Sequence, residues 1–130
     1  MNLAYCRGAL PLAYMPPMGL NSPYDRFEDI WSGLVAKLIC DHLRWYVTVG
    51  PPIVEHKRAS DPFVNLVKEA PGVGVNEWLW EEIDDIPLTG DTVMDCLMEV
   101  SIVFQEHREK YFQRYGKAIE VWVQRLQSSM

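Results

Sequence analysis

Three groups of residues carry side chains whose types and spacing suit chemistry. The first is the carboxylate pair Glu28 and Asp29, the second is the basic run His56-Lys57-Arg58, and the third is Asn65 with Lys68. Carboxylates accept protons from substrate hydroxyls, imidazole binds metals, and cationic side chains bind phosphates. Spacing alone leaves a plainer interpretation open for each group: acids at the positive end of a helix dipole, a structural histidine, and solvated charges.

The elements that must position these groups are predicted from apolar periodicity. Apolar residues at three- and four-residue steps predict a helix from Asp25 to Leu43, which would place Glu28 and Asp29 near its first turn. Residue types that favour strands, loops and caps give the other expectations. In chain order these are a strand over residues 2–5, a proline-rich loop over 11–23, a strand over 45–49, a polar turn through 71–74 and a short helix over 76–83.

The last third of the chain is predicted to form a helical hairpin. Gly90-Asp91-Thr92 is a typical helix start, and apolar residues then recur at four- and three-residue steps up to about Phe112. Tyr115-Gly116 indicates a break before a final helix that carries Ile119 and Trp122 on one face. The two helices are therefore expected to pair antiparallel.

Composition excludes several classes of protein. The chain has 130 residues, of which 48% are hydrophobic, and it contains no run of about 18 apolar residues, so neither a disordered nor a membrane-spanning protein is expected. Eighteen acidic against twelve basic residues disfavour a nucleic-acid partner, unless a modified base is the acceptor. Three widely spaced cysteines suggest neither a disulfide framework nor a zinc ribbon. The first residues do not resemble a signal peptide, and a cytoplasmic location is expected.

Ordered blocks of this sequence resemble the reversibly glycosylated polypeptides, also called UDP-arabinopyranose mutases. The clearest are Arg26-Phe27-Glu28-Asp29-Ile30-Trp31-Ser32-Gly33, Ile39-Cys40-Asp41-His42-Leu43, Gly50-Pro51-Pro52, and the run from His56 through Asn65 to Glu69. The likeness is strong over residues 2–69 and weaker afterwards. It corresponds to the C-terminal part of the family's length.

The resemblance implies an α/β fold. Residues 1–88 are expected to form the C-terminal portion of a GT-A type, Rossmann-like glycosyltransferase domain, and residues 89–130 a helical hairpin tail. The N-terminal nucleotide-binding part, with its Asp-x-Asp motif, has no counterpart here, and the start of the chain looks like a cut edge. Part of the apolar surface would then belong against that missing half, so the isolated chain is expected to associate or to dissolve poorly.

The resemblance also assigns roles to individual residues. His56 would complete the shell of a divalent metal, Mn²⁺ or Mg²⁺, and Arg58 with Lys57 would face the departing phosphates. Asp29, with Glu28 beside it, would orient a hydroxyl or accept its proton. The family usually has Asp where Glu28 stands, which favours Asp29. Trp31 and Asn65 are candidates for the nucleotide-sugar pocket, with core packing and turn formation as their alternatives.

The leading expectation is therefore the C-terminal part of a UDP-sugar-dependent glycosyltransferase or mutase that is inactive without its other half. The expected partners are a nucleotide sugar and either the missing half or a separate chain, with oligomers possible. A non-catalytic interaction module derived from the same fold is the alternative. An acidic mimic of nucleic acid ranks last, because the carboxylates do not form long runs.

Overall fold

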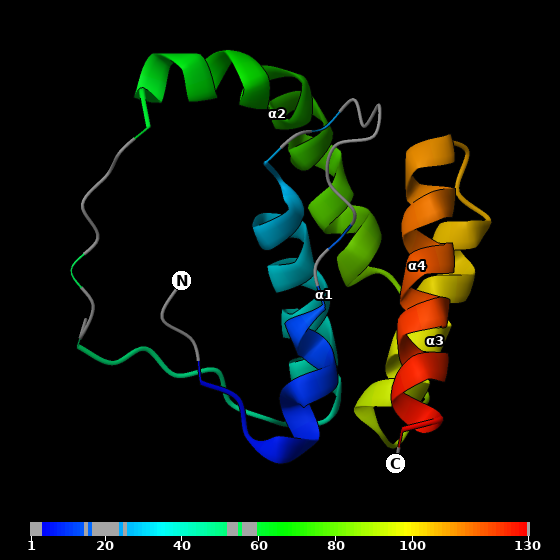
Figure 1. Ribbon diagram of the computed structural model, residues 1–130. Coiled ribbons are helices and arrows are strands. Elements are labelled where there is room, and N and C mark those ends of the chain that lie inside the picture. The colour runs from blue at the N-terminus through cyan, green and yellow to red at the C-terminus, as the bar shows by residue number, and fades with distance from the viewer. Residues whose placement is uncertain are drawn as a thin grey trace.

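The structure is a computed structural model, and it describes residues 4–14, 16, 24, 26–51, 55 and 60–129. Its elements are all helical (Figure 1). They are a 3₁₀ helix η1 (Arg7–Ala13) and the α-helices α1 (Glu28–His42), α2 (Pro62–Asp84), α3 (Val93–Gln105) and α4 (Lys110–Gln127). Within this part of the chain, no helix is long and apolar enough to cross a membrane.

The expected α/β fold of GT-A type is wrong for this chain, because no strand forms among the described residues. The strand predicted over residues 45–49 is wrong as well, because these residues have no regular secondary structure and no neighbouring strand among the described residues. A strand is stable only within a ladder that pairs its backbone groups. At the other predicted strand, residues 4–6 form no ladder, and residues 1–3 lie outside the described part.

Helix α1 confirms the helix predicted in this region and buries a stripe at four-residue steps. Its buried side chains are Trp31, Val35, Ile39 and Cys40. The helix ends in a pair of backbone hydrogen bonds: Trp45 N donates to Cys40 O at 2.7 Å, and Arg44 N donates to Asp41 O at 3.1 Å. This is a Schellman motif, in which the residue after the C-cap is left-handed. Arg44 occupies that position with φ 57°.

We expect the substitution Arg44→Gly to raise the free energy of unfolding by about 1 kcal/mol, because the left-handed conformation strains a residue with a Cβ and does not strain glycine. Urea denaturation followed by far-UV circular dichroism measures the change. The matched control is Arg114→Gly at an exposed interior position of α4, which should cost about 1 kcal/mol. Equal losses in the two variants would contradict the strain assigned to Arg44.

The polar turn predicted through residues 71–74 is also wrong, because α2 continues through them with Pro71 inside it. An N-cap stabilises the start of α2: the Asp61 side chain accepts a hydrogen bond from Phe63 N at 2.8 Å, and Pro62 lies in the first turn. Past Pro71 it buries a regular stripe, made of Gly72, Val75, Leu79 and Ile83. Packing of this stripe overrides the local preference of proline and glycine for turns.

The helical hairpin is confirmed, with α3 and α4 antiparallel and in close contact (Figure 1). Thr92 caps α3 as predicted, since its hydroxyl accepts a hydrogen bond from Asp95 N at 3.2 Å. The break lies earlier than predicted, at residues 106–109, and α4 runs unbroken through Gly116. At this glycine the helices meet closely: the Ser101 hydroxyl donates to Gly116 O at 2.9 Å.

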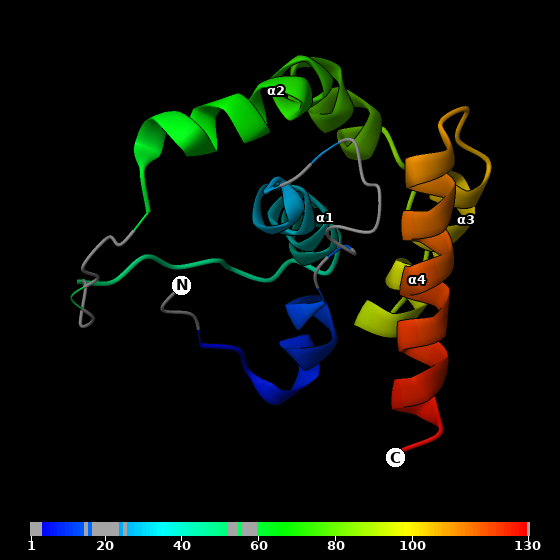
Figure 2. The same ribbon diagram turned by 45° about the horizontal axis from the view of Figure 1, so that its top comes forward.

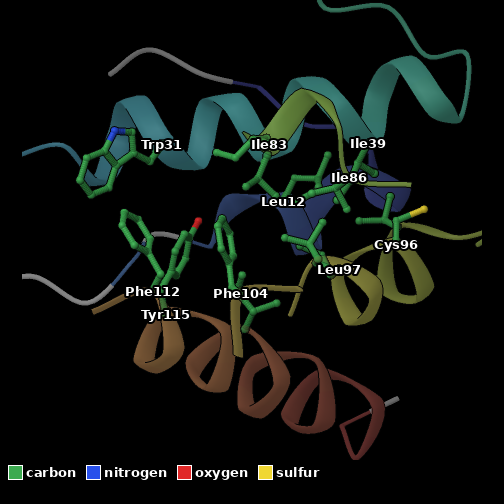
Figure 3. Packing of buried hydrophobic residues seen from close by; sticks show 14 of the residues in the cluster. Leu12, Trp31, Ile39, Ile83, Ile86, Cys96, Leu97, Phe104, Phe112 and Tyr115 are labelled. Carbon is green, nitrogen blue, oxygen red and sulfur yellow. The ribbon is translucent and has the colours of Figure 1, made fainter. Parts of the chain in front are cut away.

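All these elements share one hydrophobic core. Figure 3 shows Trp31 and Ile39 of α1, Ile83 of α2 and Leu12 of η1 facing Leu97, Phe104, Phe112 and Tyr115 of the hairpin. The segment before α1 is tied to the same hairpin, since the Tyr24 hydroxyl donates to Glu109 Oε2 at 2.6 Å. Burial, followed by this hydrogen bond, raises the pKa of Tyr24 to about 12, so the tyrosine stays protonated.

Candidate functional site

The two predicted catalytic acids lie in the first turn of α1. Asp29 is exposed, whereas Glu28 is half-buried, and its Oε2 is buried with no hydrogen-bond partner among the described residues. No side chain caps this helix start, because the N-cap residue is Phe27. The two acids lie at the positive end of the helix dipole, which agrees with the plainer interpretation of their position, but neither caps the helix. Asp29 remains open to a ligand in solution.

An ion pair joins the region of these acids to α2. Arg26 Nε donates to Glu69 Oε1 at 2.7 Å, across 43 residues of sequence. The hydrogen bond to Glu69 raises the pKa of Arg26, and the charges of Glu28 and Asp29 act in the same direction. Arg26 holds a left-handed backbone with φ 73°, which costs energy in a residue with a Cβ. The ion pair brings two of the blocks named above into contact.

Beside the ion pair, α2 comes close to Phe27, the residue that precedes α1. A Cβ built on Gly72 would lie 2.4 Å from Phe27 Cδ2, so only glycine lets the Phe27 ring seat against α2. Asn65 lies one turn before Glu69 on α2; it is buried, and its Nδ2 donates to Ser60 Oγ at 3.1 Å. In the structure Asn65 therefore helps to fix the start of α2, in keeping with its turn-forming alternative.

Trp31 lies in the core and has no exposed surface. Figure 3 shows Trp31 above Phe112 in this core. The ring centroid of Trp31 is 5.3 Å from that of Phe27 and 5.6 Å from that of Phe112, and Tyr24 and Tyr111 lie at similar distances. This position matches the core-packing alternative. The indole Nε1 is buried without a hydrogen-bond partner in the described part of the chain.

His56, Lys57 and Arg58 lie outside the described residues, so their predicted roles in metal and phosphate binding stay predictions. The described residues contain no group of three or more His, Cys, Asp or Glu side chains that could hold a metal ion. Glu28 Oε2 is a single unsatisfied oxygen and does not make a ligand set.

Sequence reasoning missed Arg26, Glu69 and Gly72 as parts of this site. Arg26 and Glu69 both stand inside the blocks that carry the family resemblance, and their opposite charges were a signal. The structure adds that the two blocks touch. Chemically, the arrangement offers an exposed carboxylate, Asp29, at the start of a helix whose N-terminal end is fixed to α2 by an ion pair.

Comparison with known proteins gives concordant matches. A family model described as "Reversibly glycosylated polypeptide" matches residues 1–130. The chain is 38% identical to "Probable UDP-arabinopyranose mutase 4" and 37% identical to "UDP-arabinopyranose mutase 1" of Arabidopsis thaliana, and 37% identical to "Probable UDP-arabinopyranose mutase 1" of Zea mays. Each match covers 95% of this chain and 36% of the relative. No solved structure matches.

Proposed function

Because the chain belongs to the reversibly glycosylated polypeptide family, we propose that it forms the acid-bearing C-terminal part of a UDP-sugar mutase. The chain spans 36% of its curated relatives, so the proposed activity requires the polypeptide that supplies the rest of the family's length. UDP-arabinopyranose is the substrate class that the names of these relatives indicate.

One observation carries the proposal: the Arg26–Glu69 ion pair joins two blocks that the family resemblance had singled out separately. A site assembled from distant segments needs such a contact to hold its parts in register. Asp29 is exposed beside this contact and is free to meet a ligand. These features support a site at the N-terminal end of α1.

In the proposed isomerisation, the bond between the anomeric carbon and UDP breaks and re-forms after the sugar ring has changed size. Asp29 orients the hydroxyl that closes the new ring, or accepts its proton and returns it to the oxygen released from the old ring. The departing diphosphate needs positive charge, which Lys57 and Arg58 would supply. Glu28 would stay beside Asp29 as a second, less exposed carboxylate. The indole of Trp31 would act from the core by holding this end of α1 in place.

A chimera tests the proposal. In "UDP-arabinopyranose mutase 1" of Arabidopsis thaliana, the portion matched by this chain is replaced by this chain, and isomerisation of UDP-arabinopyranose is followed by chromatography. We expect the chimera to be active and the isolated chain to be inactive. Asp29→Asn should lower the activity of the chimera by about 10²-fold or more, the range of general acid–base catalysis, while its circular dichroism spectrum stays unchanged.

Asp84→Asn is the matched control, because Asp84 is an exposed acid at the opposite end of α2 and should not affect the rate. Full activity of the Asp29→Asn chimera would overturn the role of Asp29. Turnover by the isolated chain would overturn the dependence on the rest of the family's length. A folded but inactive chimera would favour the non-catalytic module.

A further inference from the structure

Arg26 holds a strained backbone that no helix end explains. Its φ of 73° is left-handed, a conformation that costs energy in a residue with a Cβ. Among the described residues, the other non-glycine with positive φ is Arg44, whose conformation belongs to the Schellman motif after α1. Arg26 instead precedes α1, and the nearest described helix before it ends at Ala13. Such strain persists where the surrounding structure fixes it, and it is found at binding sites and switches.

Contacts on both sides of Arg26 fix this backbone. Two residues before it, the Tyr24 hydroxyl donates to Glu109 Oε2 at 2.6 Å, next to the start of α4. One residue after it, the Phe27 ring lies against Gly72 of α2. Figure 2 shows α1 in the middle of the molecule, with α2 passing above it and the hairpin of α3 and α4 beside it. The backbone at Arg26 therefore has to direct Tyr24 to the hairpin and Phe27 to α2.

The first turn of α1 has no cap of its own. Its N-cap residue is Phe27, whose side chain makes no cap hydrogen bond, so the contact that usually stabilises a first turn is absent there. The ion pair holds this end of the helix instead: Arg26 Nε donates to Glu69 Oε1 at 2.7 Å, and both side chains are partly exposed. After the hydrogen bond to Glu69, the charges of Glu28 and Asp29 also raise the pKa of Arg26, so the guanidinium lies near both acids.

We infer that Arg26 and Glu69 are positioning residues of the candidate site, whose ion pair offsets the strain of the left-handed backbone and so holds the first turn of α1 in place. That turn carries Asp29. What Asp29 does there rests on the proposed function, whereas the strain and its compensation are properties of this chain alone. Because the ion pair acts against stored strain, its loss frees the turn and displaces Asp29.

Two substitutions of Arg26 test the strain in the isolated chain. Arg26→Ala and Arg26→Gly both remove the ion pair, but only alanine keeps a Cβ in the left-handed backbone. We expect the Tm of Arg26→Gly to exceed that of Arg26→Ala by about 4 °C. The same two substitutions at Arg114, an exposed residue inside α4, are the matched control, and there alanine should give the higher Tm. A higher Tm for alanine at both positions would overturn the strain at Arg26.

Amide hydrogen exchange of the isolated chain tests whether the ion pair holds the first turn. Trp31 N donates to Phe27 O at 2.9 Å, so the exchange rate of this amide reports on the turn. We expect Glu69→Gln to speed its exchange about threefold, because the strained turn opens more often once the ion pair is lost. Leu43 N, which donates to Ile39 O at 3.0 Å at the other end of α1, is the control and should exchange at an unchanged rate. An unchanged rate at Trp31 as well would overturn the positioning role.

The chimera described above connects the turn to the reaction rate. Glu69→Gln should lower kcat about threefold or more and change KM less than about twofold, because a misplaced Asp29 weakens the transition state while substrate binding by the rest of the protein persists. Arg26→Lys keeps a positive charge beside Glu69 and should retain most of the kcat. Glu77→Gln is the matched control, because Glu77 is an exposed acid of the same helix without an ion pair to a described residue.

The possible failures are separable. Faster exchange at Trp31 in the Glu69→Gln chain, combined with an inactive chimera, would support the positioning pair while the proposed function fails. An active chimera whose kcat does not respond to Glu69→Gln would overturn the link between the pair and Asp29 and leave the proposed function standing. A change in KM alone would also overturn that link, since it would assign Glu69 to substrate binding.

Discussion

Replacing Trp31 by alanine is expected to lower the free energy of unfolding of the isolated chain by about 4 kcal/mol. The side chain has no exposed surface and packs among four aromatic rings, so its removal leaves a cavity that these rings cannot close. Substitutions of buried tryptophan by alanine cost about 3–5 kcal/mol. Urea denaturation followed by far-UV circular dichroism measures the loss without relying on tryptophan fluorescence.

Two variants make this result specific. Trp31→Phe keeps an aromatic ring and removes an indole N–H that is buried without a partner in the described part of the chain, so it should cost less than half as much. Trp80→Ala removes a tryptophan that is 47% exposed and should cost about 1 kcal/mol or less. A stable Trp31→Ala variant that lost only activity in the chimera would instead favour a role in the sugar pocket.

Local signals predicted the helices well where packing and propensity agree. The stripe of α1 follows from apolar spacing, and the start of α3 follows from Thr92 and its hydrogen bond to Asp95 N. Local signals failed where contacts between residues distant in sequence determine the secondary structure. Pro71 lies within α2 because the stripe beyond it packs against the core, and that packing has no signature within the residues around the proline.

The strand predicted at residues 45–49 shows a different limit. Its β-branched and aromatic composition favours a strand, but no strand forms there. Composition could not supply a partner strand, which no described residue provides. The α/β expectation came from the family's whole length, and this chain spans 36% of the relatives. A strand needs a ladder partner, and composition alone does not predict whether the fold provides one.

The two candidate acids were selected from the sequence, but the contacts around them were not predicted. Family resemblance selected Glu28 and Asp29, and the structure places both in the first turn of α1. No pattern within either block predicted that Arg26 would pair with Glu69, because the two residues are 43 positions apart in the sequence. Such contacts require the tertiary fold.

Gly116→Ala is expected to destabilise the hairpin, although alanine is the better helix former. A Cβ at this position would lie 2.6 Å from Ser101 O and 2.8 Å from Gln105 N, which are backbone atoms of α3. The helices must separate to admit it, at a cost of about 3 kcal/mol, the upper part of the range for overpacking. The higher helix propensity of alanine offsets about 1 kcal/mol of this cost, so the free energy of unfolding should fall by about 2 kcal/mol in total.

Gly33→Ala is the matched control, because a Cβ on Gly33 in the middle of α1 meets nothing within 4 Å. It should raise the free energy of unfolding by about 1 kcal/mol through propensity alone. If Gly116→Ala lowers the free energy of unfolding and Gly33→Ala raises it, then glycine is required at position 116 by the close approach of α3 and α4. This requirement would also explain why this glycine lies within a helix and not at the break that its residue type suggested. Two changes of the same sign would contradict the close contact between α3 and α4.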